Sequence, residues 1–207
     1  VCYAPMHPDD AILILRRAAT GALAAALAAA CTTSPTLTSR PTSVPPAASP
    51  SSKYYSDDGP PANPPDGLDA VPDAIPRAEP LHRFANRPYV VLGRQYVPAT
   101  SPGPYREQGV ASWYGRKFHG QRTSTGEVYD MYAMTAAHPT LPLPSYARVT
   151  SVATGKSVIV RVNDRGPFVK GRIIDLSYTA ARKLGVAGLT TVKVERITPD
   201  EIRTSAW

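Results

Sequence analysis

The sequence predicts a mainly β fold, a small closed barrel with one helix, in the second half of the chain. Two observations lead to this prediction. Five short segments rich in β-branched residues follow one another from Gly109 onward, and one segment with helix start and stop signals lies between the last two. Several short strands around one helix favour a small barrel with an apolar interior.

The expected strands are separated by turn residues, and the tetrapeptide ATGK makes a tight turn between two of them. The helix is expected to follow Ser177, which suits an N-cap, and to stop at Gly185. We therefore expect a barrel domain over residues 108–199 and a short C-terminal tail over 200–207. The strand segments are 109–115, 145–152, 156–163, 171–177 and 190–197.

The first 31 residues have the composition of an export signal. Two arginines precede an uncharged Ala/Leu-rich run of about 13 residues, which is too short to span a bilayer. Three alanines then precede Cys31, as in the lipobox of bacterial lipoproteins. The sequence leaves open whether the natural protein starts at Val1 or at Met6; with a start at Met6, Cys31 has no disulfide partner, which favours its lipidation. The alternative is an ordinary secretory signal.

Residues 32–85 are rich in Pro, Ser, Thr and Ala and predict a disordered tether. Sixteen of the 23 prolines lie between Cys31 and Tyr105, which separates this part from the expected domain. Residues 86–107 form a linker. Within it, residues 87–98 alternate enough to make a hairpin around Gly93.

The net charge of +7 belongs to the expected barrel, where 13 Lys or Arg residues face 5 Asp or Glu residues over 108–199. A basic surface suits an acidic polymer, whether nucleic acid, anionic lipid or an anionic cell-wall glycan. The export signal argues against nucleic acid as a partner.

One carboxylate is expected in an unusual place. Val158, Val160 and Val162 share one face of a strand, and the same alternation directs Asp164 toward the core. Burial there costs free energy unless the group is hydrogen-bonded, paired or protonated. A protonated carboxyl suits a general acid, whereas the turn formers around it favour a role in bracing the turn.

Three stretches carry a family resemblance: GVASWYGRKFHGQRTSTGEVYDMYAMTAAHPTLPLPSYARV, VRVNDRGPF and RIIDLSYTAARKLG. Together they resemble the rare lipoprotein A family. The resemblance implies a six-stranded double-psi β-barrel with one or two short helices. It also implies a monomeric outer-membrane lipoprotein facing the periplasm of a Gram-negative bacterium, and a lytic transglycosylase that cleaves peptidoglycan glycan strands stripped of their peptides. The residue after Cys31 is Thr32 rather than aspartate, as in Gram-negative lipoproteins that are sorted to the outer membrane.

Four residues are candidates for the chemistry under this resemblance. Asp164 would act as acid and base, and Glu127 would stabilise developing positive charge or hold the sugar ring. His138 would orient or tune a carboxylate, and Asp175 matches a position that looks catalytic in expansin-like barrels. Each has a structural alternative: a braced turn for Asp164 and Glu127, a structural loop for His138, and a helix-dipole partner for Asp175.

Four further residues are candidates for substrate binding. Trp113, Tyr114 and Phe118 offer flat faces to sugar rings, although Trp113 and Tyr114 also suit the core. Arg165 would pair with the muramic lactyl carboxylate, or brace Asp164. No zinc-type His/Cys cluster, phosphate-binding glycine loop or Ser/His/Asp signature is present, so no metal or cofactor is expected. A non-catalytic, expansin-like wall-binding protein is the alternative function.

Overall fold

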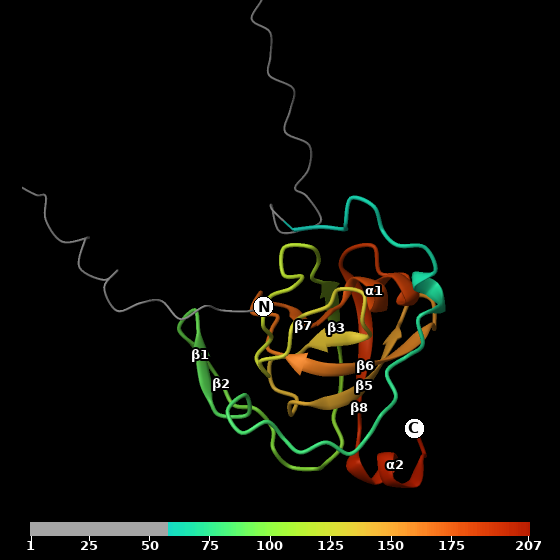
Figure 1. The fold of residues 1–207 in the computed structure, drawn as a ribbon. Helices are drawn as coiled ribbons and strands as arrows, with labels where there is room; N and C mark the ends of the chain where they lie inside the picture. Colours follow the sequence, from blue (N-terminus) through green and yellow to red (C-terminus); the bar gives the residue numbers. More distant parts are fainter. Residues whose placement is uncertain (1–57) are drawn as a thin grey trace, which may run out of the picture. The chain divides into compact units, whose positions relative to one another are not determined.

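Six strands close into a barrel in the computed structural model, which describes residues 58–207 (Figure 1). Around the barrel the strands follow the order β3-β7-β4-β6-β5-β8. The prediction of a mainly β closed barrel is therefore confirmed. The strands are β3 (Arg106–Trp113), β4 (Thr135–Ala137), β5 (Ser145–Ser151), β6 (Ser157–Asp164), β7 (Arg172–Leu176) and β8 (Thr190–Ile197).

The strand that sequence analysis missed is β4, which has only three residues. It pairs in parallel with β6 and antiparallel with β7, so it fills the gap between them. Ala137 of β4 is in register with Asp164 on one side and with Asp175 on the other. This strand therefore brings two buried carboxylates, from distant parts of the sequence, to the same level of the barrel.

The barrel interior is apolar, as predicted. Val158, Val160 and Val162 of β6 are almost fully buried and pack with branched side chains from the other strands. Helix α1 (Tyr178–Leu184) packs on the same cluster through Leu184. Its N-cap is Ser177, whose side chain accepts a hydrogen bond from the backbone of the first turn, and it ends at a left-handed glycine, as expected.

Two elements outside the barrel flank it. The hairpin predicted around Gly93 is formed by β1 (Tyr89–Val91) and β2 (Arg94–Tyr96). The stacked rings of Tyr89 and Tyr96, 5.2 Å apart, meet Phe168 edge to face. The C-terminal tail contains a second helix, α2 (Pro199–Thr204), which begins with a capping box between Thr198 and Glu201.

The structure corrects the C-terminal end of the predicted tether. Residues 58–85, here called the strap, run over the barrel and include a short 3-10 helix, η2 (Leu68–Ala70). Asp73 of the strap accepts hydrogen bonds from the backbone of Ile159 (2.8 Å) and from Lys183 Nζ (2.6 Å). Composition alone missed this because the strap has few apolar residues and is held mainly by carboxylates and backbone hydrogen bonds.

The export signal, Cys31 and residues 32–57 of the expected tether lie outside the described residues. Across residues 58–207 the structure contains no helix with the length and apolar character that crossing a membrane requires.

Candidate active site

Asp164 is the last residue of β6, and its side chain is completely buried, as the alternation of that strand predicted. Its Oδ1 accepts hydrogen bonds from Ser124 N (2.8 Å), Ser124 Oγ (2.6 Å) and Arg165 N (2.8 Å). These hydrogen bonds offset part of the free-energy cost of burying the carboxyl group. Asp164 is thus held beneath the turn that contains Ser124.

The covering turn runs from Thr123 to Glu127. The Gly126 N–H donates to Thr123 O (2.8 Å), and the Thr123 N–H donates to Glu127 O (2.7 Å). Gly126 has a positive φ of 82°, which explains the glycine at this position. Ser124 is not among the candidates that the sequence predicts. The polar run STGE around Glu127 was the signal that could have drawn attention to it.

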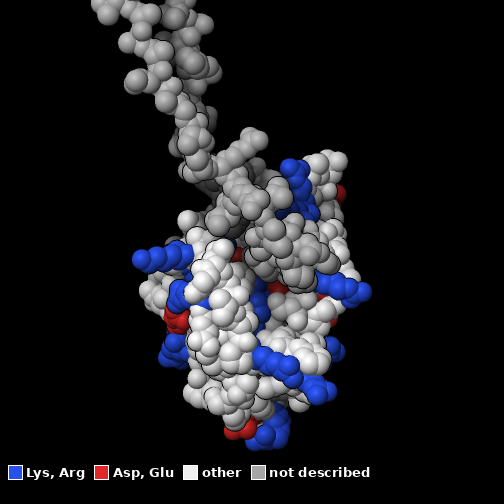
Figure 2. Space-filling view, turned by 90° about the vertical axis from the view of Figure 1, so that its left-hand side faces the viewer, with Lys and Arg blue, Asp and Glu red and all other residues white. Residues whose placement is uncertain are grey.

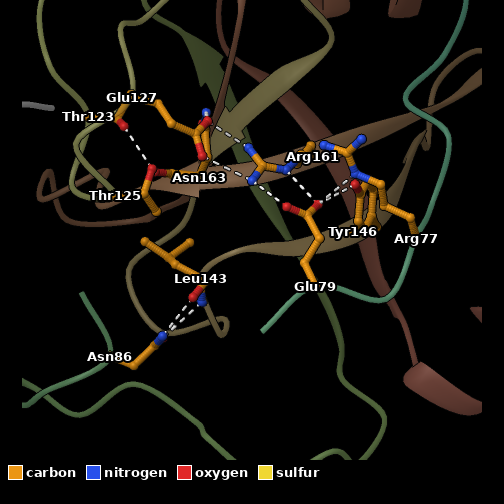
Figure 3. Close-up of polar contacts among 10 residues, drawn as sticks. All are labelled: Arg77, Glu79, Asn86, Thr123, Thr125, Glu127, Leu143, Tyr146, Arg161 and Asn163. Carbon is orange, nitrogen blue, oxygen red and sulfur yellow. Dashed lines mark hydrogen bonds and ion pairs between the residues drawn. The ribbon is translucent and has the colours of Figure 1, made fainter. Parts of the chain in front are cut away.

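Glu127 lies on the outer side of β6. Arg161 donates to both of its carboxylate oxygens, at 2.7 and 3.0 Å, and Asn163 Nδ2 donates to Oε2 at 2.9 Å (Figure 3). The hydrogen bonds from Arg161 are the largest cause of its lowered pKa. Glu127 is therefore an anion at neutral pH, and it is hydrogen-bonded to Asn163, the residue directly before Asp164.

Arg161 joins this side of the site to the strap. It also donates to Glu79, from Nε to Oε1 (2.9 Å) and from Nη2 to Oε2 (2.8 Å), and so lies between two carboxylates (Figure 3). Hydrogen bonding to Arg161 is the main cause that lowers the pKa of Glu79 to about 2. Neither residue is among the candidates that the sequence predicts. The strand alternation directs Arg161 away from the core, next to Val160 and Val162, and this could have marked it as a site residue. Glu79 lies in the segment predicted to be a disordered tether, so the sequence offers no such signal for it.

His138 is placed differently from the expectation that it orients or tunes a carboxylate. Its Nδ1 accepts hydrogen bonds from the backbone N–H groups of Thr140 (3.1 Å) and Leu141 (2.9 Å), and its Nε2 lies 3.0 Å from Tyr105 Oη. Burial, followed by the charge of Arg165, lowers the pKa of His138 to about 3. The imidazole is therefore neutral and holds the loop, which is the structural alternative.

Asp175 is buried on β7. Arg172 Nη2 donates to Oδ2 at 2.7 Å, and Ser112 Oγ donates to Oδ1. Burial raises the pKa of Asp175, while Arg172 and Ser112 oppose that shift. Asp175 is separated from Asp164 by Ala137 of β4, and its partners come from β3 and β7. Asp164 is equally buried, but its partner Ser124 lines a pocket, and neither partner of Asp175 lines that pocket.

The structure corrects the expectation that Arg165 binds a substrate carboxylate. Its guanidinium is buried and donates to the carbonyl oxygens of Ala85 (2.9 Å), His138 (3.1 Å) and Leu141 (2.5 Å), and to Asn86 Oδ1 (3.0 Å). Burial lowers its pKa to about 10. Because these acceptors take up the guanidinium N–H groups, Arg165 fastens the end of the strap to the 138–141 loop, and only part of its side chain lines a pocket.

Two of the three predicted aromatic contacts are also corrected. Tyr114 and Phe118 are buried in a second apolar cluster, where the Tyr114 ring stacks on Tyr129 at 4.0 Å. Neither ring therefore offers a face to a sugar. Trp113 is half-buried against Tyr178, at 5.3 Å between ring centroids, and the two line a pocket of about 360 Å³ beside α1.

A smaller pocket of about 250 Å³ lies beside Asp164, and we call it the hairpin pocket. It connects the covering turn to the β1–β2 hairpin, because Ser124 belongs to its lining together with residues that precede and begin β1. The lining residues are Phe84, Ala85, Arg87, Pro88, Tyr89, Val91, Ser124, Arg165 and Phe168. The position of the hairpin beside the site does not follow from the sequence pattern.

Within residues 58–207 the structure contains no group of three or more His, Cys, Asp or Glu side chains arranged to hold a metal ion. The groups gathered at the site are a buried carboxyl, a hydroxyl above it and an ionised carboxylate on the neighbouring surface. These can transfer a proton and stabilise positive charge.

Residues 106–196 match the family model described as lytic transglycolase. The chain is also similar to curated proteins named endolytic peptidoglycan transglycosylase RlpA. One, from Pseudomonas aeruginosa strain UCBPP-PA14, is 59% identical over 134 residues, which are 64% of this chain and 39% of that protein. The protein from Vibrio cholerae serotype O1 is 54% identical over 139 residues, or 66% of this chain and 53% of the relative.

The relative from Neisseria meningitidis serogroup A is 57% identical over 131 residues, or 62% of this chain and 55% of that protein. This chain thus spans between about two fifths and just over half of the length of these curated relatives. Among solved structures, the Streptomyces papain inhibitor is similar over 45% of this chain and 94% of its own, with 21% identity and a TM-score of 0.38.

Proposed function

Because this chain belongs to the RlpA-like lytic transglycolase family through its barrel, residues 106–196, we propose that it is an endolytic peptidoglycan transglycosylase. It cleaves the β-1,4 bond between N-acetylmuramic acid and N-acetylglucosamine, and its substrates are glycan strands without stem peptides. The observation that carries the proposal is the grouping of Asp164, Ser124 and Glu127 at the end of β6 beside a pocket.

In the proposed reaction Asp164 serves first as acid and then as base. It gives a proton to the glycosidic oxygen, the N-acetylglucosamine side leaves, and positive charge develops at the anomeric carbon of the muramoyl residue. The muramoyl 6-hydroxyl then attacks that carbon and returns its proton to Asp164, which closes a 1,6-anhydro ring. One carboxyl group performs both proton transfers, so the reaction needs no second catalytic carboxyl and consumes no water.

Ser124 and Glu127 support this reaction. The Ser124 hydroxyl lies 2.6 Å from Asp164 Oδ1 and also lines the hairpin pocket, so it provides the path by which the proton passes between the buried carboxyl and the sugar. Glu127 is kept ionised by Arg161, and its negative charge stabilises the positive charge that develops on the muramoyl ring.

The complete burial of Asp164 favours a second function, a wall-binding protein that does not cut. Such a protein would use the pocket and the basic surface to hold glycan, and the carboxyl would only brace the covering turn. The product of the reaction separates the two functions, and so does the behaviour of a variant at position 164.

The test is to incubate the full-length protein, purified in detergent, with peptide-free glycan strands and to analyse the products by mass spectrometry. A transglycosylase gives fragments that end in 1,6-anhydromuramic acid and are lighter by one water than hydrolytic fragments. Reducing ends would instead identify a hydrolase. Intact strands that remain bound to the protein would support the wall-binding function.

The cellular setting is part of the proposal. Similarity to peptidoglycan-cleaving relatives supports a location in the cell envelope. We propose that lipid attached to Cys31 anchors the protein in the outer membrane with its barrel facing the periplasm, and that it acts there as a monomer.

A further inference from the structure

A group of unpaired arginines lies along the segment that leads into the β1–β2 hairpin. Residues 82–96 contain three arginines and neither aspartate nor glutamate. Within the described part of the chain, Arg83, Arg87 and Arg94 form no ion pair with a carboxylate, in contrast to Arg161, Arg172 and Arg182. Figure 2, which views the molecule from the side where Figure 1 draws the hairpin, shows more basic than acidic groups on the described surface.

Arg87 is the member of this group that lines the hairpin pocket. Its guanidinium carbon lies 4.9 Å from the centroid of the Phe84 ring, and Arg83 lies 5.4 Å from the same ring. Phe84 remains 59% exposed. The ring therefore supports an arginine whose charge remains available to a ligand, because a cation over an aromatic face is held in place without being neutralised.

The rest of the pocket suits a sugar. Tyr89 and Phe168 supply aromatic surface, with their ring centroids 6.1 Å apart, and Ser124 supplies the hydroxyl that contacts Asp164. A volume of about 250 Å³ lies just below the ~300 Å³ typical of the smallest ligand pockets. The pocket is therefore too small for a longer piece of a strand and holds at most one sugar with its substituent.

We propose that Arg87 recognises the free lactyl carboxylate of a muramoyl residue and thereby selects glycan strands that lack stem peptides. This proposal rests on the proposed function and identifies the Arg87 guanidinium as the group that distinguishes peptide-free from peptide-bearing strands. In a peptide-free strand each lactyl group ends in a carboxylate, whereas in a peptide-bearing strand the same carbon is in a neutral amide. A guanidinium pairs with the first through two parallel N–H···O bonds and has no charged partner in the second.

This assignment replaces Arg165, which was expected to make the contact but is enclosed by carbonyl oxygens. Arg165 instead fixes Ala85, two residues before Arg87, so it holds the segment that presents Arg87 to the pocket. Recognition and catalysis then meet at one place, since Ser124 lines the same pocket and hydrogen-bonds to Asp164.

The experiment measures binding of two ligands to full-length protein. The first is a peptide-free glycan strand, and the second is the same strand with its lactyl carboxylates converted to N-methylamides. An Asp164→Asn background prevents turnover, and Glu127→Gln is the second background if the first does not fold. Arg87→Ala is compared with Arg203→Ala, which removes the same charge from an arginine on α2 that already pairs with Asp200.

The expected result is that the background protein binds the free strand about tenfold more tightly than the amidated strand. Arg87→Ala should lose this discrimination and bind both strands with the lower affinity, while Arg203→Ala should keep it. Equal loss of affinity for both strands in Arg87→Ala would overturn the proposal, and so would equal effects of the two arginine variants. Cleavage by wild-type protein is measured separately, so a protein that discriminates but does not cut refutes only the proposed function.

Discussion

Replacement of Glu79 by glutamine tests whether the strap is an integral part of the barrel domain. In the structure the Glu79 carboxylate receives two hydrogen bonds from Arg161 and one from the Tyr146 hydroxyl, and its side chain is 17% exposed. Glutamine preserves the shape of the side chain and removes its charge. We expect Glu79→Gln to destabilise the folded protein at neutral pH.

The size of the effect follows from the pKa of Glu79, which falls from 4.5 to about 2 in the folded protein. At ~1.4 kcal/mol for each tenfold change in proton affinity, this lowering corresponds to roughly 3 kcal/mol as an upper limit. The partial exposure of the pair to solvent reduces that figure, and we expect a loss of about 1–2 kcal/mol. For a folded region of this size the midpoint of thermal unfolding should fall by roughly 3–8 °C.

The pH dependence gives a second test. Because the folded-state pKa is lowered, the contribution of Glu79 is fully present above pH 4.5 and is lost as the pH falls toward 2. The difference between wild type and Glu79→Gln should therefore shrink as the pH is lowered through this window.

The assay is denaturant unfolding of the full chain at several pH values between 7 and 3. Asp200→Asn is the matched control, since Asp200 is 80% exposed in its pair with Arg203 and should change stability by less than about 1 kcal/mol. Identical unfolding of Glu79→Gln and wild type at pH 7 would refute the reasoning. A difference that persisted undiminished at pH 3 would show that the carboxylate charge is not its source.

Four further predictions concern the site and the anchor. Asp164→Asn should keep the fold and glycan binding but lower kcat by at least about 100-fold, and near wild-type cleavage would remove Asp164 from its role. Ser124→Ala should lower kcat on the order of 10²-fold while Ser124→Thr retains activity, and equal activity of the two variants would exclude the proton path through the hydroxyl. His138→Ala should lower stability by about 2–4 kcal/mol, because two buried N–H groups lose their acceptor. Its pH–rate profile between pH 5 and 8 should match that of wild type, since the pKa of His138 is about 3, and a shifted profile would restore a catalytic role. Cys31→Ser should release the protein from membranes in cell fractionation, and retention at the wild-type level would contradict lipid anchoring.

Local chemistry made much of the fold predictable. The alternation of Val158, Val160 and Val162 depends on neighbouring residues alone, and it placed Asp164 correctly in the interior. Ser177 and Gly185 likewise fixed both ends of α1 through hydrogen bonds within a few residues. Such features need no knowledge of distant contacts, which explains why sequence patterns were sufficient for them.

The features that were missed depend on long-range contacts. The three residues of β4 become a strand only because β6 and β7 pair on either side of them. The local sequence leaves Arg165 open as a ligand contact or a brace for Asp164, because nothing local shows that carbonyl groups from residues 85 and 138–141 surround it. Tyr114 was half expected in the core, but its stacking partner Tyr129 is 15 residues away.

The strap also limits how far from a membrane the barrel could act under the proposed anchoring at Cys31. Asp58 accepts hydrogen bonds from the backbone of Gly115 (2.8 Å) and Lys117 (3.1 Å), so the chain is already fastened to the domain there. Only residues 32–57 then remain between a lipid on Cys31 and the domain. At no more than ~3.6 Å per residue, their reach is limited to roughly 90 Å, whereas a free segment over 32–85 would allow roughly 190 Å. If the protein is anchored at Cys31 and cleaves glycan as proposed, glycan more distant than this from the bilayer is out of range. Lengthening or shortening residues 32–57 would then shift the depth of wall that the protein can reach.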